Sequence, residues 1–91
     1  TIVAESALET RLISELTELG IPGYTVTASH GAGVRGEREG DIQGGNIRIE
    51  TVLNQSTAEQ VLAHLESRYF AHYACVAWIQ EVKVLREDRF S

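Results

Sequence analysis

Cysteine, positive charge and long apolar runs are all scarce in this 91-residue sequence, and each shortage excludes a class of protein. The single cysteine, Cys75, has no partner for a disulfide within the chain, so packing or association with other chains must stabilise the fold. Eight Lys and Arg residues against thirteen Asp and Glu residues give a formal net charge of −5. Because nucleic-acid binding depends on clustered cations, we expect no nucleic-acid partner.

No apolar run approaches the roughly 20 residues that a membrane span requires, so we expect no direct membrane insertion. No signal-peptide pattern opens the sequence either, which favours a cytoplasmic protein. The length and the 43% hydrophobic content fit a single domain covering residues 1–91. A chain this short buries only about 60 to 65% of its unfolded surface, so its core alone is marginal.

Periodicity predicts two helices and four strands. Apolar residues recur at three- and four-residue spacings over residues 5–20 and 56–70, as in amphipathic helices. Each helix is expected to begin with a capping box, Ser6 with Glu9 and Ser56 with Glu59. Strands are expected at residues 1–4, 23–29, 46–53 and 74–85. This order predicts an α+β, ferredoxin-like βαββαβ fold, in which both helices cover one face of a four-stranded antiparallel sheet.

The other face of the sheet needs a cover of its own. In the last expected strand the even positions can face the helices, yet the odd positions are apolar as well. The even positions are Val76, Trp78, Val82 and Val84, and the odd ones are Cys75, Ala77 and Ile79. Another copy of the chain would cover this face without any further helix or strand, so we expect an oligomer. Scattered apolar residues that tolerate water are the competing explanation.

The segment between the second and third strands, residues 30–45, holds six of the eight glycines and five charged side chains. Gly31 and Gly33 allow backbone N–H groups to turn toward an anion, and Arg35 and Arg38 supply forked donors suited to phosphate. The segment enters a strand rather than a helix, so it is not a dinucleotide fingerprint. An anion-binding loop and a solvated hairpin connection remain equally open.

Polar residues on the two strands that flank this loop fall on the face that an oligomer would cover. They are Thr25, Thr27 and Ser29 on one strand and Asn46, Arg48 and Glu50 on the other. Buried polar groups need partners, which either a ligand at a subunit boundary or ion pairing between strands or subunits would supply. Tyr69 and Phe70 end the apolar stripe of the second helix and are expected in the core.

Catalytic and metal-binding patterns are weak. Cys75 lies in an apolar strand, where a thiol is unreactive, and no nucleophile with a base can be argued from spacing. His72 and Cys75 are three residues apart, but no second pair completes a zinc site. Acylphosphatases share the fold class, so an acylphosphatase-type enzyme stays an alternative, as does a CutA-like trimer that binds divalent metal through His72 and Cys75.

Three segments together resemble the PII signal-transduction superfamily, and more closely its PII-like members linked to bicarbonate transport and carboxysomes. They are "GYTVTASHGAGVRG", "NIRIETV" and "RYFAHYACVAWIQEVKVLR", so the resemblance covers nearly the whole chain. It implies a homotrimer that binds adenine nucleotides in clefts between subunits and is not an enzyme. A T-loop at about residues 30–45 would report occupancy to a partner.

The resemblance also implies a ligand-binding set. Gly31, Gly33, Arg35 and Arg38 resemble the part of the T-loop that meets phosphates, and Thr25, Thr27 and Ser29 resemble one wall of the cleft. Asn46, Arg48 and Glu50 resemble the far wall, the backbone of His72, Tyr73, Ala74 and Cys75 resembles a contacting loop, and Arg86 resembles a basic position that reaches phosphate.

One departure from the family pattern bears on the ligand. The glycine-rich B-loop that nitrogen-sensing members use for the outer phosphates of ATP is replaced by "YFAHYAC". We therefore expect AMP or ADP, or cyclic AMP, in preference to ATP. The carbon-linked resemblance makes bicarbonate a candidate effector, and a bicarbonate transporter or a carboxysome-associated protein the expected partner.

Overall fold

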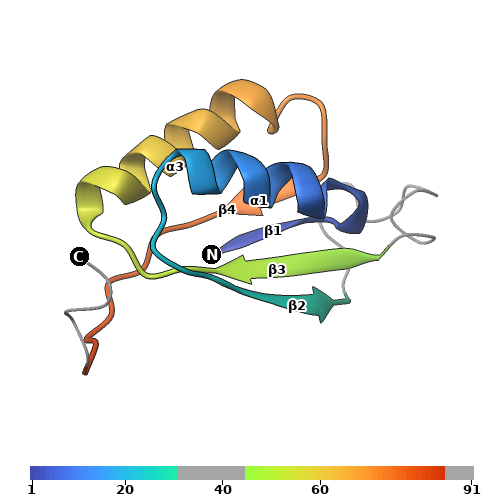
Figure 1. Ribbon diagram of the computed structural model, residues 1–91. Helices are drawn as coiled ribbons and strands as arrows, with labels where there is room; N and C mark the ends of the chain where they lie inside the picture. The colour runs from blue at the N-terminus through green and yellow to red at the C-terminus, as the bar shows by residue number, and fades with distance from the viewer. Residues whose placement is uncertain (31–44, 86–91) are drawn as a thin grey trace.

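The computed structural model describes residues 1–30 and 45–85. In chain order these residues form β1 (Ile2–Glu5), a short 3-10 helix η1 (Ser6–Leu8), α1 (Glu9–Glu18), β2 (Thr25–Ser29), β3 (Asn46–Glu50), α3 (Gln55–Arg68) and β4 (Cys75–Ala77). The four strands form one sheet in the order β2-β3-β1-β4, and every neighbouring pair is antiparallel. Both helices lie over the same face of this sheet (Figure 1). The predicted ferredoxin-like fold is therefore confirmed.

The core lies between the helices and the sheet. Alternate residues of β1 and β3 point toward the helices, and α1 and α3 meet them with leucine-rich stripes. The buried apolar residues are Ile2, Ala4, Leu8, Leu12, Leu16, Ile47, Ile49, Val61, Leu65 and Tyr69. None of the helices that the structure describes in residues 1–30 and 45–85 is long and apolar enough to cross a bilayer.

The helix ends differ from both predicted capping boxes. No side chain caps the start of η1 or of α1, because the chain passes from β1 through the 3-10 turn directly into the helix. The cap of α3 is Asn54, whose extended backbone lets its Oδ1 accept a hydrogen bond from the Thr57 N–H at 2.8 Å. Glu59 instead accepts a bond from the Gln55 side chain at 2.9 Å.

The last strand is shorter than predicted, and the residues that face the helices are those predicted to face away from them. Only Cys75–Ala77 pair with β1, in a register that sets Cys75 opposite Ala4 and Ala77 opposite Ile2. Since Ile2 and Ala4 face the helices, Cys75 and Ala77 pack against the core as well. Val76 is 45% exposed on the opposite side. The prediction that Val76 and Trp78 face the helices is therefore wrong.

The sheet face that points away from the helices, which we call the outer face, still carries apolar side chains. Val76 and Trp78 are exposed there, and Val76 lies opposite Val3 of β1. Tyr69 is fully buried as predicted, but Phe70 is 38% exposed, because α3 ends at Arg68 and the chain turns there.

Candidate functional site

The predicted ligand-binding residues divide between the described and undescribed parts of the chain. Gly31, Gly33, Arg35, Arg38 and Arg86 lie outside the described residues. The others fall on β2, on β3, between α3 and β4, or at Cys75, the first residue of β4.

The six polar residues of β2 and β3 share the outer face. The register of these strands sets Thr25 opposite Glu50, Thr27 opposite Arg48, and Ser29 opposite Asn46. Ile47 and Ile49, which alternate with the polar residues of β3, are buried under the helices. Cross-strand neighbours of this kind lie about 5 Å apart, so the six side chains form one polar strip.

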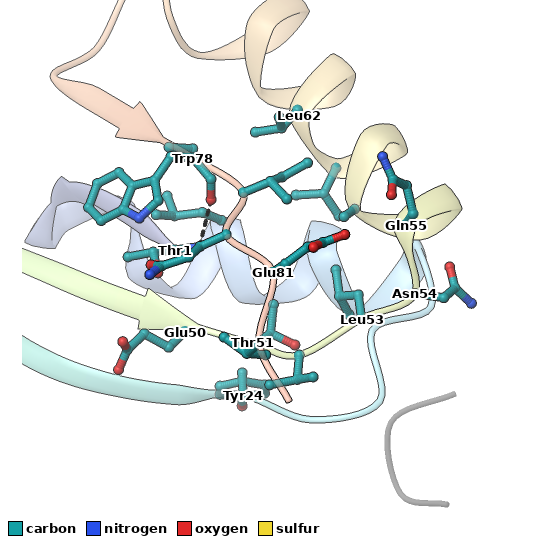
Figure 2. Close-up of a pocket in the computed structure, with 18 of the residues that line it drawn as sticks. Thr1, Tyr24, Glu50, Thr51, Leu53, Asn54, Gln55, Leu62, Trp78 and Glu81 are labelled. Atoms are coloured by element: carbon teal, nitrogen blue, oxygen red, sulfur yellow. Dashed lines mark hydrogen bonds between the residues drawn. The ribbon is translucent and has the colours of Figure 1, made fainter. Parts of the chain in front are cut away.

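One end of this strip opens on a groove of about 1170 Å³, which Figure 2 shows in close-up. We call this region the groove end. The Arg48 guanidinium lies 3.4 Å from Glu50 and 5.6 Å from the centre of the Trp78 ring. Two hydrogen bonds of 3.0 Å between backbone groups join Thr1 to Trp78 at this end of the sheet. Thr25, Arg48, Glu50 and Trp78 all line the groove, together with Tyr24 and Leu53.

The other end of the strip borders residues 31–44, and we call it the loop end. Ser29 and Asn46 lie opposite each other there, and the β1–β3 register adds Glu5 beside Asn46. The Ala74 N–H donates to the Glu5 carboxylate at 2.6 Å, and the Glu5 N–H donates to the Ala74 carbonyl at 3.2 Å. Glu5 therefore sits between two predicted ligand-binding residues, Asn46 and Ala74.

Sequence reasoning missed Glu5, although a signal was present. Ile2 and Ala4 alternate with Val3 and Glu5, so the strand pattern places Glu5 on the outer face. The interpretation of residues 5–20 as one helix assigned Glu5 to the wrong element, because the apolar helical spacing begins only three residues later.

The turn between α3 and β4 uses its own backbone donors. The N–H groups of His72 and Tyr73 donate to the Tyr69 carbonyl at 3.1 and 2.9 Å, and that of Ala74 donates to Glu5. Three of the N–H groups predicted to contact the ligand are therefore already bonded within the chain. Any ligand that takes them must displace these bonds.

Cys75 has no features of a nucleophile. Burial, and after it the negative charge of Glu5, raises the pKa of the thiol to about 11, so it is protonated at neutral pH. Within residues 1–30 and 45–85, no group of three or more His, Cys, Asp and Glu side chains could hold a metal ion.

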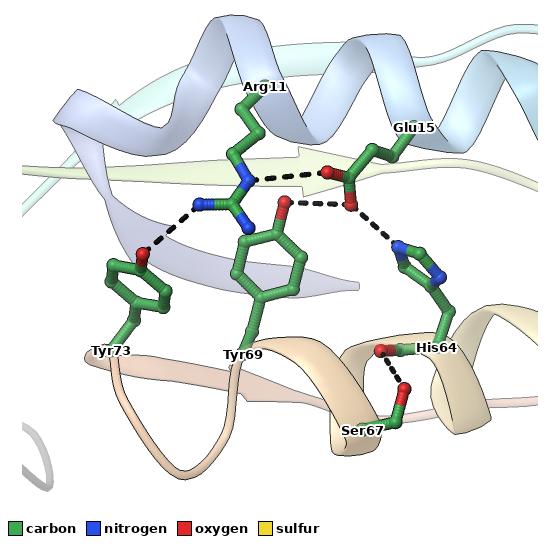
Figure 3. A network of polar contacts seen from close by, with 6 residues as sticks. All are labelled: Arg11, Glu15, His64, Ser67, Tyr69 and Tyr73. Carbon is green, nitrogen blue, oxygen red and sulfur yellow. Dashed lines mark hydrogen bonds and ion pairs between the residues drawn. The ribbon is translucent and has the colours of Figure 1, made fainter.

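A polar network on the helix side fixes the start of this turn (Figure 3). The Glu15 carboxylate of α1 accepts bonds from the Tyr69 hydroxyl at 2.8 Å, from His64 Nε2 at 2.6 Å and from Arg11 Nε at 3.2 Å. Arg11 also donates to the Tyr73 hydroxyl at 3.1 Å and stacks over the Tyr69 ring at 5.0 Å. These contacts tie α1 to the end of α3 and to the turn.

The pKa values of the network follow from these contacts. Burial opposes ionisation of Glu15, but the bonds from His64, Tyr69 and Arg11 outweigh it and lower the pKa of the carboxyl. Burial, followed by the bond to Glu15, raises the pKa of Tyr69 to about 12. The hydrogen-bond donors around Glu15 therefore stabilise the ionised form of its carboxylate.

The groove end and the loop end are separated along the strands. Asn46 and Glu50 are four residues apart on β3, which is about 13 Å along a strand. Each end has only part of the predicted set. The predicted ligand-binding residues of one chain are therefore divided between two ends of one polar strip.

Comparison with known proteins identifies the fold family. The model of the family described as nitrogen regulatory protein P-II matches residues 1–89. A structure described as a PII-like signaling protein from Thermus thermophilus is 44% identical and superposes with a TM-score of 0.84, covering 99% of this chain and 90% of that one. A search of curated proteins finds no match.

Two more distant structures share the fold. Both are of CPII from Thiomonas intermedia K12, one bound to ADP and bicarbonate and one bound to ADP, AMP and acetate. The first is 23% identical, with a TM-score of 0.83, and covers 99% of this chain and 89% of that one. The second is 19% identical, with a TM-score of 0.82, and covers 98% and 88%. With the family model matching nearly the full length, the chain belongs to the P-II family of nitrogen regulatory proteins.

Proposed function

We propose that this chain is a non-enzymatic signalling protein that binds AMP or ADP in clefts between the subunits of a homotrimer. Cyclic AMP and bicarbonate are further candidate ligands. The T-loop, residues 30–45, reports occupancy to a partner in inorganic-carbon uptake or fixation, either a bicarbonate transporter or a carboxysome-associated protein. The protein acts in the cytoplasm.

The observation that supports this proposal is that the predicted ligand-binding residues of β2 and β3 stand on one face, at two ends of one polar strip. The groove end offers Thr25, Arg48 and Glu50, and the loop end offers Ser29 and Asn46. A cleft between two copies brings the groove end of one against the loop end of the other. That arrangement completes a site that neither copy has alone.

The exposed apolar residues of the outer face support association of copies. Val76 lies on the edge strand β4, Trp78 follows this strand and lines the groove end, and both are more than a third exposed in the isolated chain. Aromatic anchors of this kind dominate the energy of protein interfaces. Covering them with a second copy removes their apolar surface from water.

The ligand class is supported by the relatives and by charge. CPII, which has the same fold, is described with ADP, AMP and bicarbonate. In this chain Arg35 and Arg38 of the T-loop, with Arg86, supply the guanidinium groups that pair with phosphate oxygens. Ligand contacts that differ between two T-loop conformations then shift the population that the partner recognises.

Two measurements on the same samples test the proposal. Sedimentation at micromolar concentration is expected to give a trimer, and calorimetric titration with AMP, ADP, ATP and cyclic AMP, with and without bicarbonate, is expected to give heat with AMP or ADP. A stable monomer, or no heat with any of the four nucleotides, refutes the proposal. Turnover of an acyl phosphate would instead favour an enzyme.

A matched pair of variants locates the site. Arg48→Ala removes a cation from the groove end, and Arg68→Ala removes one from the last turn of α3, on the helix side. We expect Arg48→Ala to weaken nucleotide binding about tenfold or more, because charge-assisted bonds contribute about 1.5–3 kcal/mol. Arg68→Ala is expected to bind like the wild type. Equal affinities for both variants would place the site elsewhere.

A further inference from the structure

We propose that Glu5 limits the negative charge of the ligand, so that the site selects AMP or ADP over ATP. This inference rests on the proposed function. It adds a specificity-determining residue that lies in the middle of the loop end and is itself an anion.

The backbone fixes the position of Glu5. Ile2 and Ala4 are buried under the helices, so Glu5 points to the outer face of the sheet. The register sets Glu5 opposite Asn46, and Asn46 opposite Ser29. Neighbouring strands in a sheet lie about 4.8 Å apart, so a phosphate that reaches Asn46 comes within a few ångströms of the Glu5 strand.

The Glu5 carboxylate already occupies an amide donor at this end. The Ala74 N–H donates to Glu5 Oε2 at 2.6 Å, a short hydrogen bond. The backbone bond from the Glu5 N–H to the Ala74 carbonyl, at 3.2 Å, holds the two residues in place. A backbone N–H bonded to a carboxylate is the donor that a phosphate oxygen would otherwise take.

The pKa of the neighbouring Cys75 thiol is consistent with a negative charge at this point. Burial raises the pKa of this thiol to about 11, and the negative charge of Glu5 adds to the shift. The Glu5 carboxylate lies beside Asn46 of β3 and is bonded to Ala74 of the turn, so its charge stands next to both. Each phosphate added to a nucleotide brings more negative charge toward this point, and like charges in a cleft are penalised more strongly than in water.

The test compares a charge change with a geometry change at the same position. Glu5→Gln keeps an oxygen that accepts the Ala74 bond but removes the charge, whereas Glu5→Asp keeps the charge on a shorter side chain. The affinities for AMP, ADP and ATP are measured by calorimetry on each trimer. We expect Glu5→Gln to raise the ratio of ATP to AMP affinity about tenfold, and Glu5→Asp to leave this ratio near that of the wild type.

Glu18→Gln, at the exposed end of α1, is the control for losing one negative charge from the chain, and it is expected to leave the ratio unchanged. A Glu5→Gln ratio equal to that of the wild type, while AMP still binds, overturns the inference and leaves the proposed function standing. The inference is also overturned if Glu5→Asp prefers ATP as Glu5→Gln does, because geometry rather than charge would then decide. A wild type that binds no adenine nucleotide removes both proposals.

Discussion

The two sides of the sheet differ in the surroundings of their polar side chains. On the helix side, Arg11, Glu15, His64, Tyr69 and Tyr73 bond to one another, and the apolar residues around them are closely packed. On the outer face, polar side chains stand beside exposed apolar ones and open on a groove. The polar groups of the helix-side network thus find their partners within one chain. The outer face therefore marks the surface where ligands and other copies are expected.

The largest loss of stability is expected when an apolar side chain is removed from the core between the helices and the sheet. Leu65 is fully buried, so Leu65→Ala is expected to lower the free energy of unfolding by about 3 kcal/mol, through lost burial and a residual cavity. Denaturant unfolding at one fixed protein concentration measures this change. Leu62→Ala, at a less buried position of the same helix, is expected to cost clearly less. Equal losses would contradict the contrast between packed and open surfaces.

The next prediction concerns association. If the chain forms the proposed trimer, Trp78→Ala is expected to shift it toward monomers by about 30-fold, corresponding to about 2 kcal/mol, because aromatic anchors carry much of the energy of an interface. Sedimentation over a range of concentrations measures the shift. Phe70→Ala is the matched control, since Phe70 is 38% exposed and Trp78 is 39% exposed, but Phe70 follows α3. A loss of association in the Phe70 variant instead would assign the interface to the helix side.

The network around Glu15 gives a smaller effect. Glu15→Ala leaves the buried Tyr69 hydroxyl without its acceptor, which is expected to cost about 1–3 kcal/mol of unfolding free energy. Glu18→Ala removes an exposed carboxylate of the same helix and is expected to change the stability by less than about 0.5 kcal/mol. Thermal unfolding of both variants measures the difference. Identical melting temperatures would mean that the network contributes nothing.

The smallest effect is a dependence on pH. The pKa of Glu15 is lower in the folded chain than in the unfolded one, so its contribution is present above the unfolded pKa of about 4.5 and is lost as pH falls through the folded pKa. Between pH 6 and 3 the wild type is expected to lose more stability than Glu15→Gln. Denaturant unfolding across this range gives the two slopes. Parallel slopes would show that the bonds to Glu15 do not hold it ionised.

The element order and the faces of β2 and β3 could be predicted from the sequence because their alternation is clear. Ile47 and Ile49 alternate with polar residues, so only one face can be buried. In β4 both faces are apolar, so the sequence alone could not assign them. The pairing of Cys75 with Ala4 decides the matter, and it depends on a strand at the opposite end of the sequence.

The helix starts and the loop end of the site were harder to predict for a local reason. A Ser with a Glu three residues later is common, and at α3 the chain uses Asn54, two residues upstream, as the cap. At α1 the 3-10 turn takes the place of a cap, so β1 extends to Glu5. Because the first helix was predicted to begin at residue 5, Glu5 was assigned to that helix and not to β1. For this reason it was not included among the predicted ligand-binding residues.

Ser29 and Asn46, the last residue of β2 and the first of β3, are paired directly, and Gly45 is pinned to Ser6 by a backbone bond of 3.1 Å. Pairing within the sheet thus holds the end of β2 and the start of β3 together. Peptides of different length and composition could be spliced between these two ends at little cost in closure entropy. One sheet can therefore carry different connecting segments, and so the proposed recognition of different partners, without change to the proposed ligand clefts.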